Sequence, residues 1–368
     1  MSFSEFDRRC MGRALELAAR GLNTTDPNPR VGSVVALGEV IVGEGWHERP
    51  GEPHAEVLAL RAAAERSHGA TVYLTLEPCT HFGRTPPCVD AVLGASVTRV
   101  VCAMIDPNPR VRGSGIAKLR EAGITVESGL CETQARALNP GFIRRMEEGL
   151  PWVRIKFGAS LDGRTALANG ASRWITSEEA RADVQCWRAR SSAILTGSGT
   201  VLKDDPRLDV RSPPSGSPGP RQPLRVILDT ELRTPFEARI LDAPGRALIM
   251  TGVASGPRRA QFDARGIATE PMQRAAQGLD LHAVMRRLAQ MEVNEVWVES
   301  GPRLAGALLQ EGLVNEVVAY FAPSVLGSNA RGMFDLPELV SLDRRAQLEF
   351  RDVRRIGPDI RVVAACRS

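Results

Sequence analysis

Apolar residues in the first 122 positions recur at helical spacing and at strand spacing in alternation. Residues 7–20 place their apolar side chains on one face of a helix, and Gly21 stops that pattern. The Val- and Ile-rich run 31–42 predicts a strand hairpin. Beyond it, the pattern predicts helices over 54–64, 88–95 and 115–122, and strands over 71–76 and 99–104. Strands and helices that alternate at short intervals indicate an α/β fold.

A second alternating pattern occupies residues 152–322. It predicts strands over 152–159, 193–196, 224–229, 247–251, 295–299 and 316–322, and helices over 177–189, 279–290 and 302–311. The polar stretch Leu138–Pro151 ends in a proline and is interpreted as a domain boundary, which predicts two domains, 1–147 and 148–368. The tract 212–220, rich in Ser, Pro and Gly, cannot hold regular structure, so we interpret it as a loop inserted in the second domain.

Length and composition agree with two globular domains. The chain has 368 residues, of which 43% are hydrophobic and 5% aromatic. No stretch approaches the roughly 20 apolar residues of a membrane span, and the N-terminus lacks the pattern of a signal peptide. Seven thinly spread cysteines argue for reduced thiols rather than a disulfide framework. We therefore expect a cytoplasmic protein without a membrane partner.

The charge balance is close to neutral, at +4, and no basic block with interleaved aromatics occurs, so no nucleic-acid partner is predicted. Only three of the 47 basic residues are lysines, namely Lys118, Lys156 and Lys203. The arginine excess is most simply an effect of codon usage. A lysine retained inside an apolar run, as Lys156 is, marks a position where arginine does not serve.

The first half carries a candidate metal site. His54-Ala-Glu56 opens a predicted helix, Pro78-Cys79 follows a predicted strand, and Cys88 comes nine positions later. One imidazole and two thiolates can hold Zn²⁺ and leave a fourth position open for water, while Glu56 carries a proton. His-x-Glu followed by Pro-Cys is typical of zinc deaminases, although eight residues rather than two separate these cysteines. A purely structural zinc site, closed by His81, is the alternative.

The second half carries four candidate segments at strand ends, namely 156–163, 172–177, 197–206 and 299–307. Glu299-Ser-Gly301 leads from a strand into a helix with Pro302 in its first turn, an arrangement that suits a phosphate group. It is not a Gly-x-Gly-x-x-Gly fingerprint, so a Rossmann dinucleotide site is not supported. The segment 197–206 is interpreted as a polar Gly-rich loop.

Four segments of the first half, 27–32, 51–56, 76–81 and 83–88, resemble the deaminase domain of the bifunctional riboflavin-biosynthesis deaminase–reductase family. The long spacing between the two cysteines is a feature of that family. The resemblance implies a three-layer, cytidine-deaminase-like fold. It implies one Zn²⁺ per chain on His54, Cys79 and Cys88, with Glu56 as the catalytic proton shuttle. It further implies a substrate pocket lined by Asn28, His81 and Arg84.

The four segments of the second half resemble the reductase domain of the same family, which has a dihydrofolate-reductase-like fold and uses NADPH. The implied NADPH contacts are Gly158, Ala159, Trp174, Thr200, Asp204, Thr230, Gly301, Pro302, Arg303, Leu304, Ala305, Gly306 and Ala307. The implied substrate contacts are Lys156, Ser172, Arg188, Leu208, Arg211 and Glu299, with the two arginines on the phosphate and Lys156 near the ribose.

The predicted function is therefore two consecutive reactions on one phosphorylated pyrimidine, a zinc-dependent deamination and an NADPH-dependent reduction of its ribosyl chain. The alternatives are a nucleoside or tRNA deaminase with a degenerate accessory nucleotide-binding domain, and a zinc-stabilised binding protein that senses a nucleotide. The sequence leaves the oligomeric state open, with a homo-oligomer as one option.

Overall fold

The computed structural model describes residues 3–83, 86–211 and 221–367. The chain divides into two compact units, Met1–Gly149 and Leu150–Ser368. Arg84 and the predicted loop 212–220 lie outside the described residues. None of the helices in the described ranges combines the length and the apolar character that a membrane crossing demands.

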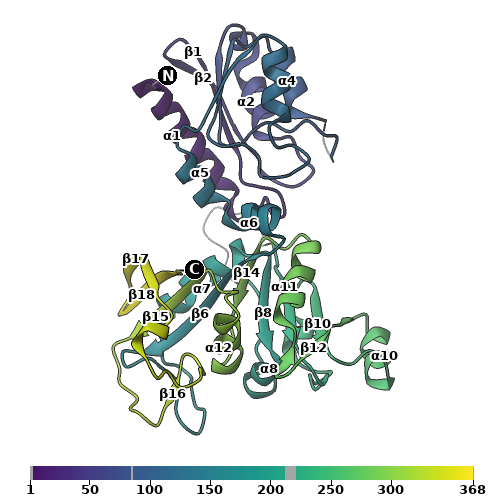
Figure 1. Ribbon diagram of the computed structural model, residues 1–368, viewed down its shortest axis with the longest axis vertical. Helices are drawn as coiled ribbons and strands as arrows, with labels where there is room; N and C mark the ends of the chain where they lie inside the picture. The colour runs from purple at the N-terminus through teal and green to yellow at the C-terminus, as the bar shows by residue number, and fades with distance from the viewer. Residues whose placement is uncertain (1–2, 84–85, 212–220, 368) are drawn as a thin grey trace. The chain divides into compact units, whose positions relative to one another are not determined.

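The first unit contains a five-stranded sheet in the order β2-β1-β3-β4-β5 (Figure 1). Its strands are β1 (Gly32–Leu37), β2 (Val40–Trp46), β3 (Thr71–Leu74), β4 (Arg99–Cys102) and β5 (Thr125–Ser128). Strand β1 pairs antiparallel with β2 and β3, whereas β3, β4 and β5 run parallel. The α-helices are α1 (Glu5–Arg20), α2 (Ala55–Ala63), α3 (Cys88–Gly94), α4 (Ser114–Glu121), α5 (Glu132–Leu138) and α6 (Pro140–Glu148).

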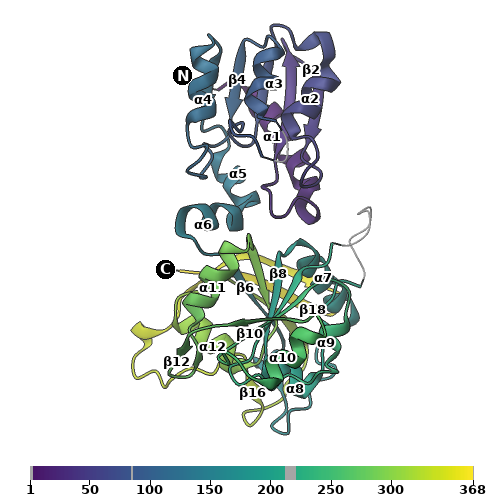
Figure 2. The same cartoon turned by 90° about the vertical axis from the view of Figure 1, so that its right-hand side faces the viewer.

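Helices cover both faces of this sheet and make a three-layer unit. On one face, Met11 and Leu17 of α1 pack with Val34 and Tyr73 of the sheet. On the other, a second apolar cluster joins α2, α3 and α4 to the opposite sides of the same strands, and Figure 2 shows these three helices on the face turned to the viewer. The inner strands β1, β3 and β4 alternate their side chains between the two clusters, which the period of two predicts.

The second unit is built on a nine-stranded sheet in the order β11-β10-β9-β8-β14-β6-β15-β18-β17. Its strands are β6 (Trp152–Ser160), β8 (Ala193–Gly197), β9 (Leu224–Leu228), β10 (Ala247–Thr251), β11 (Ala268–Pro271), β14 (Glu295–Val298), β15 (Glu316–Ala322), β17 (Leu348–Ile356) and β18 (Asp359–Cys366). All neighbours from β11 to β15 run parallel. The pairs β15–β18 and β18–β17 are antiparallel.

Two small ribbons and six α-helices complete the described part of this unit. The ribbons pair β7 (Arg164–Ala166) with β16 (Arg331–Gly332), and β12 (Arg274–Ala275) with β13 (Gly278–Leu279). The helices are α7 (Glu178–Arg190), α8 (Ser198–Asp204), α9 (Arg239–Asp242), α10 (Pro257–Ala264), α11 (Leu281–Gln290) and α12 (Pro302–Gln310). Short 3₁₀ turns lie at Gly21–Asn23, Ala64–Ser67 and Leu342–Arg344.

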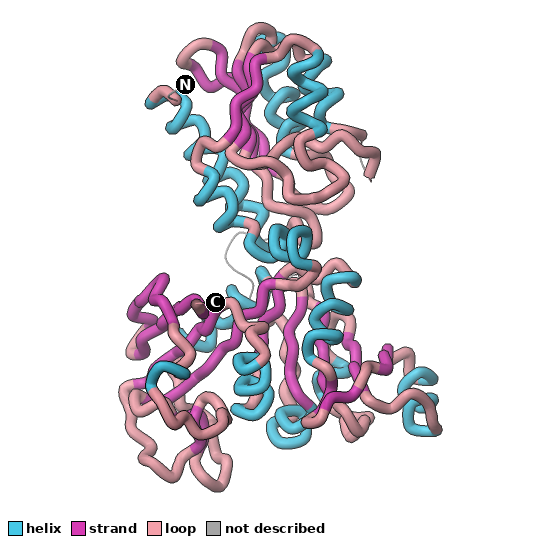
Figure 3. Tube along the Cα trace, viewed as in Figure 1, coloured by secondary structure: helices cyan, strands magenta, loops and turns pink. Residues whose placement is uncertain are grey.

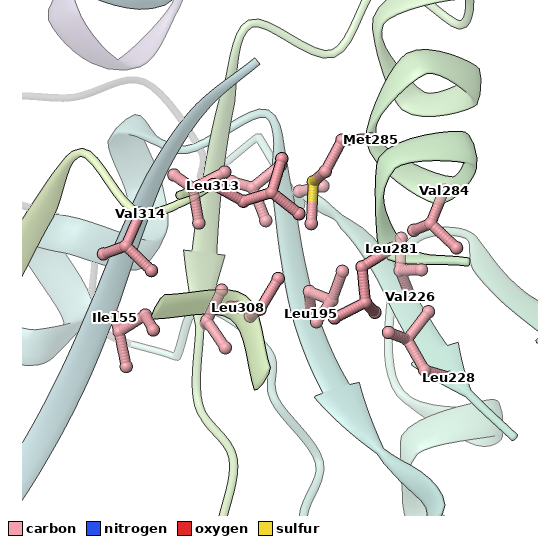
Figure 4. Packing of buried hydrophobic residues seen from close by; sticks show 14 of the residues in the cluster. Ile155, Leu195, Val226, Leu228, Leu281, Val284, Met285, Leu308, Leu313 and Val314 are labelled. Carbon is pink, nitrogen blue, oxygen red and sulfur yellow. The ribbon is translucent and has the colours of Figure 1, made fainter. Parts of the chain in front are cut away.

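The central strands of the second sheet are also buried on both faces. Figure 4 shows Met285 of α11 and Leu308 of α12 packed with Leu195 and Val226 of the central strands. On the opposite face, α7 contributes Val184 to a separate apolar cluster. Parallel strands with both faces covered read as nearly continuous apolar runs, which is why the sequence pattern located these strands.

Several segments differ from the sequence-based interpretation, and three of them are described here (Figure 3). The boundary stretch Leu138–Pro151 is largely helix α6, whose buried Phe142 and Ile143 join the first core. The segment 197–206, interpreted as a loop, contains helix α8. Val201 of this helix packs into the same apolar cluster as Val184 of α7. The hairpin β17–β18 was not predicted, because most residues of β17 are exposed and show no apolar alternation.

Helix α1 begins with a capping box in which Ser4 and Asp7 exchange hydrogen bonds. The buried Asp7 carboxylate also accepts hydrogen bonds from Tyr73 Oη at 2.7 Å and Arg99 Nη1 at 2.6 Å. Burial alone would raise the pKa of Asp7, but these donors hold it well below its usual range. The ionised Asp7 therefore ties the start of α1 to β3 and β4.

We expect Asp7→Asn to lower the free energy of unfolding by about 2 kcal/mol at neutral pH, because an ionised acceptor with several donors is lost. The folded pKa is depressed, so the contribution is complete above the unfolded pKa of about 4 and is lost as the pH falls below it. Denaturant titrations at neutral and acidic pH measure both effects. The control is Asp90→Asn, which removes an exposed ion pair with Lys118 and is expected to cost less than about 0.5 kcal/mol.

Candidate active sites

Three soft ligands converge in the first unit. His54 precedes the first residue of α2, Cys79 lies in the loop after β3, and Cys88 is the first residue of α3. Their donor atoms all lie within 4.8 Å of one another, and His54 Nδ1 is 2.9 Å from Cys88 Sγ and 3.7 Å from Cys79 Sγ. One nitrogen and two sulfur donors at these separations fit Zn²⁺ with a fourth position left open.

The electrostatics of the cluster favour a thiolate at Cys79. Hydrogen bonding by Cys88 and by His54 lowers the pKa of the Cys79 thiol, although burial opposes this. The backbone N–H of Cys88 also donates to Cys79 Sγ at 3.3 Å. Because metal-bound cysteine is deprotonated, this donor set already provides one of the anionic ligands that a zinc ion requires.

Glu56 lies in the first turn of α2, two residues after His54, and only 3% of its surface is exposed. Burial raises the pKa of its carboxyl group to about 6. Among the described residues, none donates a hydrogen bond to its Oε2 atom. Buried carboxylate oxygens almost always have a partner. An unpartnered one beside a metal-type cluster therefore suits a group that exchanges protons with a bound ligand.

A buried carboxylate that the sequence analysis missed supports this loop. Glu77 Oε1 accepts hydrogen bonds from the backbone N–H groups of Gly115 and Ile116, and Glu77 Oε2 accepts from those of Asp106 and Gly113. These four bonds join the loop that carries Cys79 to the start of α4. The sequence signal for Glu77 was an acidic residue at the end of a predicted buried strand, directly before Pro78.

A second histidine, His47, links Asn28 to the cluster. The Asn28 side-chain amide is 3.0 Å from His47 Nε2, and the His47 ring contacts that of His54 edge-on, with centroids 4.9 Å apart. Burial and the neighbouring His54 lower the pKa of His47 to about 4. His47 was not predicted. His81 is exposed and does not belong to the three-residue cluster, so the described residues give no support to a closed four-ligand site.

The second unit contains a cavity of about 1120 Å³ at the carboxyl ends of its parallel strands. Most of the predicted residues line it, namely Lys156, Gly158, Ser172, Trp174, Arg188, Thr200, Asp204, Leu208, Thr230, Glu299, Gly301, Pro302, Arg303, Leu304 and Ala307. Open α/β sheets bind ligands at this edge, because the loops that leave parallel strands meet there.

Four predicted contacts lie outside the cavity lining. Ala159 and Ala305 are fully buried, and Ala305 packs into the apolar core. Gly306 faces the Asp335 carbonyl oxygen so closely that a Cβ would lie 2.0 Å from it. The Arg211 side chain is 62% exposed and 3.7 Å from Asp209. A linear motif includes every residue of the segment 301–307, but the turn of α12 directs only some of these residues into the cavity.

Lys156, Arg188 and Glu299 form the charged centre of the cavity. Arg188 Nε and Nη2 donate to the two oxygens of Glu299, at 2.6 and 3.0 Å. Burial alone would raise the pKa of Glu299, but Arg188 and Lys156 hold it at about 2. Burial lowers the pKa of Lys156, which lies within β6 rather than at its end. The sequence analysis placed Arg188 on a phosphate, whereas here its guanidinium group binds Glu299.

The cavity also offers a place for the phosphates of a nucleotide. Helix α12 begins at the N-cap residue Gly301 with Pro302 in its first turn, which directs free backbone N–H groups into the cavity wall. Five further basic side chains, which the sequence analysis did not predict, line the cavity: Arg173, Arg181, Lys203, Arg233 and Arg331. The signal available for Lys203 was its place among only three lysines. A large basic cavity with a helix N-terminus fits a dinucleotide phosphate cofactor.

Fold, cluster and cavity together define a two-domain enzyme with one hydrolytic and one nucleotide-dependent site. Residues 4–104 match the cytidine and deoxycytidylate deaminase zinc-binding region, and residues 151–362 match the RibD C-terminal domain. The chain belongs to the RibD family of riboflavin biosynthesis proteins.

Relatives and solved structures of this family match nearly the whole chain. The riboflavin biosynthesis protein RibD of Escherichia coli is 49% identical over 366 residues, which covers 96% of this chain and 98% of that protein. The structure of Acinetobacter baumannii RibD (form 1) superposes with a TM-score of 0.92 at 43% identity, covering 99% of both chains. A deaminase/reductase from Thermotoga maritima superposes with a TM-score of 0.85 at 30% identity, covering 98% of this chain and 99% of that one.

These comparisons confirm several predictions: the fold class, the bifunctional deaminase–reductase family, and zinc and NADPH as its cofactors. The alternative of a tRNA or nucleoside deaminase with an accessory domain finds no support, because the reductase half matches RibD as well.

The ligand set generates a direct test. We expect the purified protein to carry one zinc ion per chain, and Cys88→Ala to carry none, because two donors do not retain the metal at a site open to water. Elemental analysis by mass spectrometry measures the ratio. The control is Cys186→Ala, which removes an exposed thiol of α7 and leaves the zinc content unchanged. Full zinc content in Cys88→Ala would refute the assigned ligand set.

Proposed function

We propose that residues 1–147 deaminate 2,5-diamino-6-ribosylamino-4(3H)-pyrimidinone 5′-phosphate and that residues 148–368 reduce the ribosyl chain of the product. The observation that carries the first activity is the buried, unpartnered Glu56 oxygen beside the His54–Cys79–Cys88 cluster. The second rests on the basic cavity around Lys156 and Glu299. The Thermotoga maritima relative is named as a diaminohydroxyphosphoribosylaminopyrimidine deaminase and a 5-amino-6-(5-phosphoribosylamino)uracil reductase, which supports both assignments.

In the deaminase domain, we assign His54, Cys79 and Cys88 to zinc. Bound there, zinc activates water near neutral pH. Glu56 takes a proton as the water oxygen forms a bond to the ring carbon that bears the 2-amino group. It returns that proton to the nitrogen as the C–N bond breaks and ammonia leaves. We assign Asn28, His81 and Arg84 to the substrate pocket; Arg84 lies outside the described residues.

We expect Glu56→Gln to retain zinc but to lower the rate of ammonia release by about 10³-fold, because the amide cannot accept and return the proton. An enzyme-coupled ammonia assay measures the rate. Glu52→Gln is the matched control, since Glu52 lies in the turn that precedes α2 and is exposed. A normal rate in Glu56→Gln would exclude the proposed shuttle.

In the reductase domain, we assign the wall formed by Gly158, Trp174, Thr200, Thr230, residues 301–304 and Ala307 to NADPH, which supplies the hydride. The hydride goes to C1′ of the ribosyl chain as its bond to the ring oxygen breaks, and that oxygen takes a proton to become a hydroxyl group. The product is 5-amino-6-ribitylamino-uracil 5′-phosphate. Lys156 and Glu299, an amine and a carboxylate at the centre of the cavity, bind the ribose hydroxyl groups.

We expect Lys156→Met to lower kcat/KM for NADPH oxidation by about 100-fold, because the ribose loses a charged donor worth roughly 2–3 kcal/mol. Ammonia release remains unchanged, since it occurs in the other domain. Absorbance of NADPH at 340 nm measures the reduction. Lys118→Met is the matched control, as Lys118 is exposed and pairs with Asp90 in the first unit. Equal activity of both variants would remove Lys156 from the site.

We further propose the cytoplasm as the compartment and a small phosphorylated pyrimidine as the only substrate class. The requirement for reduced Cys79 and Cys88 supports a reducing compartment.

A further inference from the structure

A tryptophan outside the cavity lining donates a hydrogen bond to the central carboxylate of the reductase site. Trp297 is fully buried in β14, and its indole Nε1 lies 2.9 Å from Glu299 Oε1. Glu299 directly follows β14 and is two positions from Trp297, so the two side chains leave the chain on the same side. Trp297 therefore contacts Glu299 from outside the cavity. Glu299 itself lines the cavity, whereas Trp297 does not.

The donors to Glu299 are distributed unequally over its two oxygens. Oε1 accepts from Trp297 Nε1 and from Arg188 Nε, whereas among the described residues Oε2 accepts from Arg188 Nη2 alone. A carboxylate offers about four acceptor positions, two on each oxygen. Oε1 is therefore saturated, and Oε2 keeps the free acceptor position.

A stacked pair of indoles holds this arrangement. The ring of Trp187 lies over that of Trp297, with centroids 5.5 Å apart and 9° between the planes. Trp187 immediately precedes Arg188 on α7, so the stack joins the helix that carries the arginine to the strand that carries the carboxylate. Aromatic pairs of this kind are worth about 1 kcal/mol beyond the area that they bury.

We propose that Trp297 is a positioning residue of the reductase: it saturates Glu299 Oε1 and thereby presents Oε2 to a hydroxyl group of the ribose. This inference rests on the proposed function, which places Glu299 on the substrate. Without the indole N–H, Arg188 still binds both oxygens of Glu299, but each oxygen then has a free acceptor position. The ribose hydroxyl group is then no longer directed to Oε2 alone.

The test compares Trp297→Phe with Trp187→Phe in the full-length protein. Trp297→Phe keeps an aromatic ring in the stack but removes the donor to Glu299. Trp187→Phe perturbs the same stack and, among the described residues, removes no hydrogen bond to Glu299. We expect Trp297→Phe to raise KM for 5-amino-6-(5-phosphoribosylamino)uracil about tenfold, the effect of one hydrogen bond to a charged group. Its KM for NADPH and its rate of ammonia release stay within twofold of the parent protein, as do all parameters of Trp187→Phe.

Two outcomes overturn the proposal. If the two variants lose the same affinity for the substrate, the stack matters and the donor does not. If Trp297→Phe also raises KM for NADPH tenfold, its effect is a general loss of structure.

Glu299→Gln separates this inference from the proposed function on which it rests. If Glu299→Gln impairs substrate binding while Trp297→Phe does not, only the positioning role fails. If Glu299→Gln binds the substrate normally, the assignment of Glu299 fails and the positioning role fails with it. If Glu299 binds the substrate and Trp297 positions Glu299, adding Trp297→Phe to Glu299→Gln changes KM for the substrate by less than twofold. The reason is that the two changes act through one carboxylate.

Discussion

Both sites depend on the parallel pairing of neighbouring strands. In a parallel pair the carboxyl ends lie at the same edge of the sheet, so the loops that leave them converge. In the first unit, the loop after β3 brings Cys79 to this edge, and the backbone after β4 is joined to it through Glu77. In the second unit, β8, β9 and β14 release the segments that begin at Gly197, Thr230 and Glu299 into one cavity. Residues more than 100 positions apart thereby become neighbours.

Three carboxylates with little exposure to solvent are paired, whereas Glu56 has one oxygen without a donor among the described residues. Asp7, Glu77 and Glu299 each accept several hydrogen bonds, which compensates the loss of water around their carboxylates. Glu56 is equally buried, but its Oε2 atom has no donor among the described residues. The paired groups position backbone and neighbouring side chains, whereas the unpaired one is available for chemistry. The same rule, that burying a carboxylate without donors costs free energy, explains why the paired groups stabilise the fold and why Glu56 is reactive.

Much of the fold and of the candidate site was accessible from the chain alone, for physical reasons that differ between segments. Central strands such as β10 and β15 were predicted because burial on both faces leaves an apolar run. Helix α8 was not predicted, because a Gly-rich start disfavours a helix and the packing of Val201 becomes visible only in the folded chain. Site residues with a motif, such as His54 and Cys79, were found. Trp297 has no motif, and its role exists only because Glu299 turns towards it.

The kinds of residue, their order and their spacing follow from the sequence, and these were sufficient for the two-domain α/β class, the zinc-type ligands and the reductase family. Which atoms meet was decided by tertiary structure. The bidentate contact of Arg188 with Glu299 joins residues 111 positions apart, and the exclusion of Gly306 from the cavity results from the close approach of the Asp335 backbone. Spacing constrains contacts only within one helix or strand, because the path of the chain between elements is set by the packing of the whole core.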